Sequence, residues 1–335
     1  GTVGAADPGT ETFGDLRHWL LQPQDSWLDA LGLRPREWDL ALDDFDPLQL
    51  DERMRSSLLR ASLEASSGVG GPDPGRADQR SQPDQSGPPK AAAPGVGMGA
   101  GGDAMVPAVL DPPDWLGQYR GQGLLPARSA GILEAARLSQ RHGSLHQSLQ
   151  ALGPGERRQV SHGALQAELL WHGDCLVVWH SAQVRGAHHQ DLWLALLLAT
   201  AAGEAPRRGL LIGRDGDRFR PLAQIRPPAS PQEAERLLKQ LIAWRQQGRQ
   251  HCWPLPPETG WTLALAEGRQ AGSGRARAID CWEGGPNRRG ERQQASQALC
   301  FGADRPGREL VDASFAALAC AFHGPLLAGL EVLRP

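Results

Sequence analysis

Apolar residues recur at about every third or fourth position in several stretches of the chain, which is the spacing of amphipathic helices. The first stretch, Phe13 to Leu20, follows Thr12, a residue type that caps helix N-termini, and Pro23 ends it. A second short helix over 25–31 ends at Gly32. The same spacing predicts a helix or pair of helices over 128–150 and single helices over 48–65, 190–202, 230–247, 257–271 and 315–330.

Two other parts of the chain have the patterns of strands. Val160 to Leu170 alternates between apolar and polar residues, and Cys175 to Val184 is largely apolar, with a turn at 172–174 between them. These two strands form a predicted hairpin. A second hairpin is predicted for 209–213 and 218–222 around the turn at 214–217. Helices that pack on paired strands make the expected class α/β or α+β.

The composition divides the chain into three parts. Residues 66–105 are almost entirely Ser, Gly, Pro, Asp, Gln and Ala, and they contain too little apolar surface to offset the entropy of ordering. We therefore predict a flexible low-complexity insertion over 66–105. It separates an N-terminal helical segment, 1–65, from a main domain, 106–335. Within the main domain, residues 272–295 read as an irregular loop.

The charge of the chain is nearly balanced, with 35 basic and 38 acidic residues and a formal net charge of -3. This balance gives no global attraction to nucleic acid or to an anionic membrane, and it favours a protein scaffold over a free-standing DNA binder. Lysine occurs only at Lys90 and Lys239. Eleven tryptophans accompany a single tyrosine. Most are expected in the core, with two or three exposed ones available, together with the first helical segment, for partner contacts.

The cysteines and the apolar runs bear on the compartment. The five cysteines include no C-x-x-C pair, and several lie in apolar runs, so we expect buried free thiols in a reducing environment. The longest apolar run, Leu192 to Ala202, is shorter than the roughly 20 residues that a membrane helix needs. We therefore predict a cytoplasmic protein without a membrane partner.

Several motifs, in a consistent order, resemble the RecC family, the gamma subunits of exodeoxyribonuclease V. The motifs are Phe13-x-x-Leu16 through Pro23, Trp27-Leu28 and Leu31-Gly32; Asp43-Asp44-x-x-Pro47-Leu48-x-Leu50-Asp51; Gly123-Leu124-Leu125-Pro126 followed by Gly131; Leu192-Trp193-Leu194 with Arg214-Asp215-Gly216 downstream; and Trp253-Pro254-Leu255-Pro256-Pro257-Glu258-Thr259-Gly260. Each motif is weak by itself. The combination resembles the C-terminal region of these proteins over nearly the whole chain outside the insertion.

The resemblance implies both a fold and a role. The C-terminal domain of RecC is similar to the nuclease domain of its partner RecB, of the restriction-endonuclease-like type. RecC contacts RecB and RecD, channels the separated strands and helps to process double-strand DNA ends for recombinational repair. Magnesium and ATP act in the partner subunits, so the resemblance implies no cofactor in this chain and contact with DNA ends through the complex.

The resemblance implies that an active nuclease of this type has the pattern G-x-x-D on one strand, D/E-x-K at the end of the next strand and Q on the following helix. The two carboxylates of the strands hold magnesium. Laid on this chain, the pattern places Gln166 at the first acid, Trp179 at the second and Ser181 at the lysine. Gln190 alone keeps its residue type. The resemblance therefore implies a nuclease fold without catalytic residues. A shifted alignment leaves an active magnesium-dependent nuclease using Glu168 as an alternative.

Other candidate sites remain open at the level of sequence. His172, His180, His188, His189 and Asp191 are close together but lack the regular spacing of metal ligands. Asp215-Gly216-Asp217 has part of a calcium-loop pattern, although a hairpin turn explains it better. A stand-alone single-strand DNA-binding module, using tryptophan stacking, is a third function. The best phosphate contacts for it are in an arginine cluster, whose solvated-loop interpretation is equally open: Arg269, Arg275, Arg277, Arg288, Arg289 and Arg292.

Overall fold

The computed structural model describes residues 11–33, 49–67, 115–286 and 288–333. The helices that precede the sheet are α1 (Phe13–Leu21), α2 (Pro23–Ala30), α3 (Glu52–Ser67), α4 (Trp115–Gly121) and α5 (Arg128–Gln150). The predicted cap is confirmed, because the Thr12 hydroxyl accepts the backbone N–H of Asp15 at 3.1 Å. The helix predicted over 128–150 is confirmed as a single helix.

A six-stranded mixed sheet, in the order β1-β2-β3-β4-β5-β8, forms the centre of the molecule. Its strands are β1 (Gly155–His162), β2 (Leu165–His172), β3 (Cys175–Gln183), β4 (Arg208–Asp215), β5 (Arg218–Ile225) and β8 (Leu330–Val332). Only β3 and β4 pair in parallel, and the helix α6 (Gly186–Ala201) connects them. The other neighbouring strands are antiparallel, so the class is α/β, as predicted.

The first strand is where the sequence prediction is wrong. Residues 160–170 do not form one strand, because the chain turns at Gly163 and Ala164 and pairs with itself as β1 and β2. Gly163 has a φ of 59°, a left-handed conformation that glycine adopts without strain. The apolar pattern continues through this short turn, which hides it in the sequence. The predicted hairpins β2–β3 and β4–β5 are confirmed.

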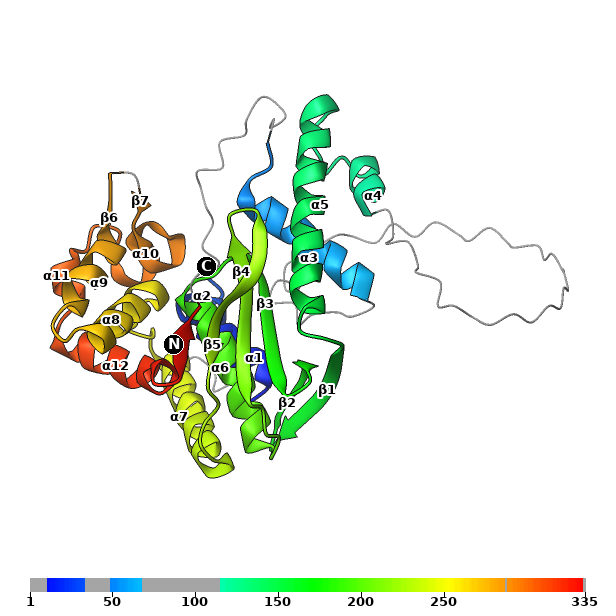
Figure 1. Ribbon diagram of the computed structural model, residues 1–335. Helices are drawn as coiled ribbons and strands as arrows, with labels where there is room; N and C mark the ends of the chain where they lie inside the picture. The colour runs from blue at the N-terminus through cyan, green and yellow to red at the C-terminus, as the bar shows by residue number, and fades with distance from the viewer. Residues whose placement is uncertain (1–10, 34–48, 68–114, 287, 334–335) are drawn as a thin grey trace, which may run out of the picture.

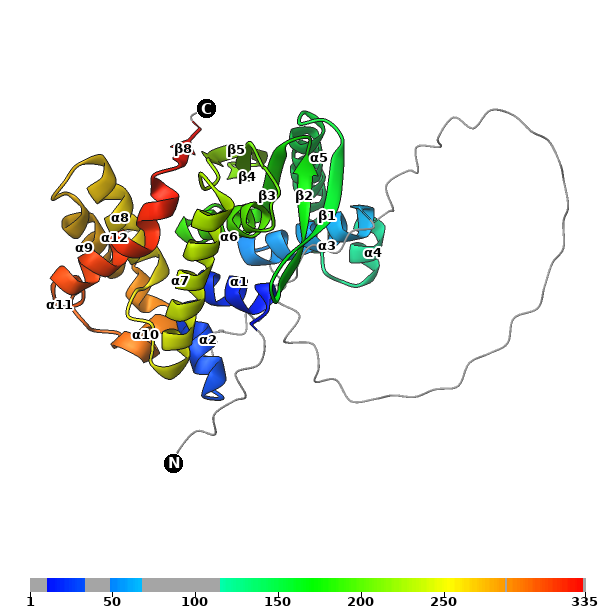
Figure 2. The ribbon, with the colours of Figure 1, turned by 90° about the horizontal axis from the view of Figure 1, so that it is seen from below.

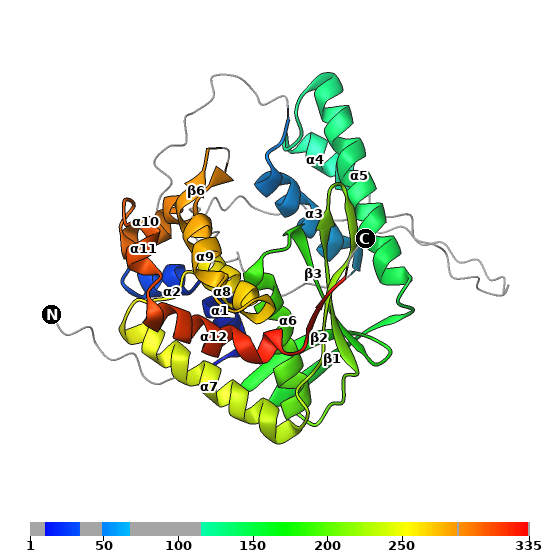
Figure 3. The ribbon, with the colours of Figure 1, turned by 60° about the vertical axis from the view of Figure 1, so that its left-hand side comes forward.

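The sheet is covered on both faces (Figure 1). Successive residues of a strand point to opposite faces. Leu176 and Leu211 therefore pack in the main core with α6, while Val177 and Leu210 pack on the other face with Leu145 of α5 and side chains of α3. The helix α6 is apolar on all sides because α1, α7 (Pro231–Gln250) and the sheet enclose it. Figure 3 shows this packing and the path of α12 to the closing strand β8.

The C-terminal part is a group of helices on the other side of α6 and α7 from α5 (Figure 2). It contains α8 (Pro257–Arg269), α9 (Gly274–Glu283), the short pair β6 (Gly284–Gly285) and β7 (Arg288–Arg289), the 3-10 turn Glu291–Gln293, α10 (Ala295–Phe301), α11 (Gly307–Leu310) and α12 (Ala313–Leu327). The prediction of an irregular loop over 272–295 is wrong. Its arginine-rich composition hides a helix that buries Gly274, Ala278 and Trp282, one turn apart.

The N-terminal helices share the core of the main body. Phe13, Leu16, Trp19 and Leu20 of α1 are buried in the same cluster as the apolar side chains of α6 and α12. The acidic motif at 43–47 and residues 68–105 of the predicted insertion lie outside the described residues. Within the described residues, no helix combines the length and the apolar character of a membrane span.

Among the tryptophans whose side chains are described, none is exposed, so these do not supply the expected exposed set. Trp19 packs edge to face against Trp253 and Phe322, and the three ring centroids are 5.3–6.0 Å apart. The five cysteines are free thiols, as expected. Only Cys175 is buried, however, and Cys320 is exposed on the outer face of α12.

Candidate functional site

A cavity of about 360 Å³ lies along β2 and β3 against helices α1, α3 and α6. Gln166 of β2 and Trp179 and Ser181 of β3 are all in its wall. Three of the four positions that the resemblance aligns with the nuclease pattern therefore come together in space. The cavity is the candidate functional site of this chain.

The fourth position, Gln190, points elsewhere. Its side-chain amide is buried and lies 2.7 Å from Nδ1 of His323 on α12. Burial, helped by the nearby His189, lowers the pKa of His323 to about 3, so its neutral ring can accept the amide N–H. Gln190 thus joins α6 to α12, and its neighbour Asp191 is the polar residue of α6 that lines the cavity.

Asp191 is held by an arginine from the N-terminal helix. Nε of Arg17 donates to Oδ1 of Asp191 at 2.5 Å, and Nη2 donates to Oδ2 at 2.6 Å, a forked pair between α1 and α6. The side chain of Asp191 is 4% exposed, and that of Arg17 is 11% exposed. Burial alone disfavours the carboxylate, but the charge of Arg17 and the contact with His180 outweigh it and hold the pKa of Asp191 below its ordinary value. Both carboxylate oxygens are therefore occupied by the protein itself.

The histidines beside this pair serve packing and capping. Nε2 of His180 lies 3.0 Å from Oδ2 of Asp191, and its ring stacks on His188 with centroids 4.0 Å apart. Nδ1 of His188 accepts the backbone N–H of Arg185 at 3.0 Å, and burial lowers the pKa of His188 to about 2. Among the described residues, no group of three or more His, Cys, Asp or Glu side chains has the arrangement of a metal site.

The remaining acid in the cavity wall is Glu168. It is half exposed, and one of its oxygens accepts a hydrogen bond from Arg157 of β1 at 3.1 Å. The two carboxylates of the cavity thus each face an arginine of this chain. The aspartates of the calcium-like pattern are also ion-paired. Asp215 pairs with Arg220, and Asp217 pairs with Arg141, around the tight turn of the β4–β5 hairpin.

The six arginines predicted for phosphate contact lie on regular elements rather than in a loop. Arg269 ends α8, Arg275 and Arg277 lie on α9, and the pair Arg288 and Arg289 forms β7. The Arg275 guanidinium donates to the backbone oxygen of Val311 at 3.1 Å, and the Arg288 guanidinium to that of Asp280 at 2.8 Å. Arg292 is half-buried in the turn before α10.

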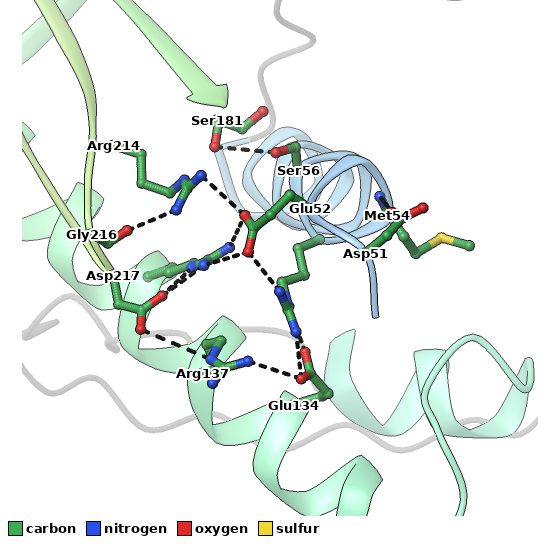
Figure 4. Close-up of polar contacts among 12 residues, drawn as sticks. Asp51, Glu52, Met54, Ser56, Glu134, Arg137, Ser181, Arg214, Gly216 and Asp217 are labelled. Carbon is green, nitrogen blue, oxygen red and sulfur yellow. Dashed lines mark hydrogen bonds and ion pairs between the residues drawn. The ribbon is translucent and has the colours of Figure 1, made fainter. Parts of the chain in front are cut away.

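An ion-pair network behind the cavity was not foreseen from the sequence (Figure 4). Arg55 of α3 makes two hydrogen bonds of 2.7 Å to Glu134 of α5. Glu52, in the first turn of α3, accepts from Arg141 of α5 at 3.0 and 3.1 Å and lies 3.2 Å from Arg214 of β4. Although partial burial raises it, the hydrogen bonds from Arg141 and Arg55 dominate and lower the pKa of Glu52 to about 2. The network fixes α3 to α5 and to the sheet.

A second cavity, of about 370 Å³, adjoins the first and shares Arg60 and His180 with it. Glu291 lies in its wall and accepts the backbone N–H groups of Glu258 and Thr259, at 3.0 and 2.6 Å, in the first turn of α8. Burial raises the pKa of Glu291 to about 7 and also raises that of Glu258.

The raised pKa of Glu291 predicts how the stability of the protein changes with pH. The folded state holds the proton on Glu291 more tightly than the unfolded chain does, so the associated stability is present below about pH 4.3 and is lost as the pH rises toward 7. We expect Glu291→Gln, which keeps an acceptor oxygen, to flatten the fall in the free energy of unfolding between pH 5 and pH 7 (roughly the window set by this linkage). Urea denaturation across that window measures it. Parallel pH profiles for the two proteins would contradict the assignment.

The comparison with protein families identifies the family of the chain. The model of the RecC C-terminal domain matches residues 8–268, which is more than half of the chain. The chain belongs to the RecC C-terminal domain family. The RecC resemblance is thus confirmed, and it makes the chain part of a subunit of an exodeoxyribonuclease V complex, with a role in DNA repair and recombination. No curated protein sequence matches the chain.

The RecC match also separates the two groups of candidate residues. It includes α1, α3 and every residue of the cavity wall, among them Arg17, Arg60 and Asp191. It ends at residue 268, one residue before Arg269, so all six arginines of the predicted cluster lie beyond it. The matched region therefore contains the cavity and does not contain the arginine cluster.

Proposed function

We propose that this chain is the non-catalytic C-terminal domain of a RecC-like subunit of a helicase–nuclease that processes double-strand DNA ends in recombinational repair. It acts as a scaffold for RecB-like and RecD-like subunits and guides a separated strand. The observation that carries the proposal is that Gln166, Trp179 and Ser181, the positions that the resemblance aligns with two acids and a lysine, line one cavity.

The order of the elements supports a nuclease-like ancestry. The family pattern needs two successive strands and a following helix, and β2, β3 and α6 follow in that order, with Gln166 and Ser181 of the strands and Asp191 of the helix lining one cavity. This is the arrangement expected of a restriction-endonuclease-like domain. We infer that the fold was kept while its chemistry was lost.

The chemistry of the cavity supports a non-catalytic role. Magnesium prefers several oxygen ligands, and its carboxylate ligands must be free to bind it. Here Asp191 has both oxygens committed to Arg17 and His180, and Glu168 faces Arg157. The cationic side chains of the wall are arginines, whose pKa lies too high for an arginine to exchange a proton with water at neutral pH. A metal-activated water therefore has neither a set of free ligands nor a lysine partner among the described residues of the wall.

A nuclease assay tests the absence of catalysis. Purified protein, shown to be folded by circular dichroism, is incubated with labelled linear single-strand and double-strand DNA in magnesium or manganese. We expect no cleavage above a no-protein control. Cleavage that disappears in Glu168→Ala would establish the alternative, an active nuclease that uses Glu168 as a metal ligand.

A second experiment tests the scaffold role. The chain is used as bait for RecB-like and RecD-like subunits of the same source, and we expect a stable complex with at least one of them. Failure to bind either subunit, combined with tight and strongly salt-dependent binding of single-strand DNA, would favour a stand-alone DNA-binding module instead.

A further inference from the structure

Arg60 is the unusual cation of the cavity. It projects from α3 into the walls of both adjoining cavities and is half-buried. No hydrogen bond or ion pair joins its guanidinium to any other described residue, whereas Arg17 and Arg157 pair with the two carboxylates of the first cavity. The described wall of that cavity therefore carries one positive charge in excess. A half-buried guanidinium, with five N–H donors, is suited to an anionic ligand with several oxygens.

Ser181 supplies a second, independent observation. Its side chain is in the wall of the same cavity and only 2% exposed, yet its Oγ has no hydrogen-bond partner. A buried hydroxyl without a partner is unfavourable, so a ligand oxygen that approaches it gains a hydrogen bond that the protein does not provide. Figure 4 shows Ser181 beside α3, where its backbone oxygen accepts from Ser56 at 3.4 Å.

The helix that carries Arg60 is held in place before any ligand arrives. Arg55, one turn earlier on α3, is locked to Glu134, and Glu52 is locked to Arg141. These contacts hold the first part of α3 against α5 and the β4–β5 hairpin, and Arg60, further along the same helix, lines the cavity. A site on a fixed helix loses less entropy on binding than a site on a loop.

We propose that this cavity binds one phosphate group of a single DNA strand between Arg60 and Ser181, without cleaving it. The choice of DNA as the polymer rests on the proposed function. The phosphate itself follows from the free guanidinium, the unpaired hydroxyl and the cavity volume of about 360 Å³, which is in the usual range for small ligands. A single strand is flexible enough to place one phosphate in a cavity of this size, whereas the paired strands of a duplex are not.

The test is the binding of a fluorescein-labelled oligothymidylate of about twenty nucleotides, followed by fluorescence anisotropy at several salt concentrations. Removing one phosphate contact weakens binding about equally for all sequences and lowers the salt dependence by about 0.7 in a log–log plot for single strands. We expect Arg60→Ala to raise Kd roughly three- to tenfold and to lower the slope by that amount. Ser181→Ala is expected to raise Kd to a smaller extent.

The matched control is Arg207→Ala, which removes the same charge from a side chain that is 81% exposed and outside the cavity. Because Arg60 makes no hydrogen bond or ion pair with another described residue, we expect Arg60→Ala to leave the thermal midpoint nearly unchanged, and measuring that midpoint separates a loss of binding from unfolding. Equal effects of the two arginine variants, or no binding of the oligonucleotide at low salt, would overturn the proposal.

Two further arms identify the ligand. An abasic oligonucleotide should compete as well as oligothymidylate, because the site contacts the backbone. Competition by inorganic phosphate alone, with no advantage for the oligonucleotide, would show a free-phosphate site and overturn the DNA assignment. These outcomes are independent of the nuclease and partner experiments, so the phosphate site and the scaffold role can fail separately.

Discussion

Replacing Asp191 by alanine should lower the free energy of unfolding by about 3–5 kcal/mol, the cost of breaking a buried ion pair by removing one partner. The substitution leaves the Arg17 guanidinium, 11% exposed, without its forked acceptor and leaves His180 without a carboxylate. It also removes the link between α1 and α6 that closes one side of the cavity. Urea denaturation at pH 7 measures the loss.

Two controls separate the pair from a general effect of charge. Asp304→Ala changes an exposed aspartate with no recorded contact in the described residues and should alter stability by less than about 0.5 kcal/mol. The double replacement Arg17→Met with Asp191→Leu removes both charges and should recover most of the loss, because apolar residues can replace a buried pair at little cost. A double variant that is no more stable than Asp191→Ala would contradict this account.

The same pair has a signature in acid. The pKa of Asp191 is lower in the folded protein than in the unfolded chain, so its contribution is present above the unfolded value of about 3.9 and is lost as the pH falls below it. Stability of the native protein should therefore fall more steeply below pH 4 (roughly the unfolded value) than that of Asp191→Ala. Glu291 acts in the opposite direction and in a higher pH window, so the two effects do not overlap.

Replacing Glu134 by alanine should lower the free energy of unfolding by about 2–4 kcal/mol, less than for Asp191 because Arg55 keeps its contact with Glu52. Glu134 is 3% exposed at its side chain and accepts the two hydrogen bonds from Arg55 that help to fix α3 to α5. Its loss should loosen α3 and with it the position of Arg60. Chemical denaturation gives the change in stability, and limited proteolysis at α3 reports its release.

Glu156→Ala is the matched control for this prediction. Glu156 also accepts two hydrogen bonds from an arginine, Arg158, but at an exposed site on the edge strand β1. Exposed pairs contribute little because water solvates both partners, so the expected loss of stability is much smaller than for Glu134→Ala. Similar losses in the two variants would show that burial of the Arg55–Glu134 pair is not what stabilises α3.

The nuclease pattern selected some residues of the candidate site and missed others. The nuclease pattern, aligned with the sequence, selected Gln166, Trp179 and Ser181, and these residues line one cavity. Alternate residues of a strand point to the same face of the sheet, so residues that the pattern spaces in this way can meet there. The pattern did not foresee Arg17 or Arg60, since both come from helices distant in sequence. It also placed weight on Gln190, which the turn of α6 directs toward α12 instead.

The sequence by itself determined the elements whose signals are local. The cap at Thr12, the helix over 128–150 and the β4–β5 hairpin depend on a few neighbouring residues, and they form where the pattern predicts. The order of short motifs along the chain was also enough to predict the RecC family. Local signals failed at 163–164 and 272–295, where a short turn and a polar helix resemble their surroundings in composition.

Only the tertiary structure decided the chemistry of the cavity. Arg17 and Asp191 are separated by 174 positions in the chain, and Arg55 and Glu134 by 79. No local pattern pairs such residues, because the free energy that joins them comes from burial by the intervening sheet and helices. The same burial decides which carboxylates are committed, which hydroxyl is unpaired and which arginine is left for a ligand.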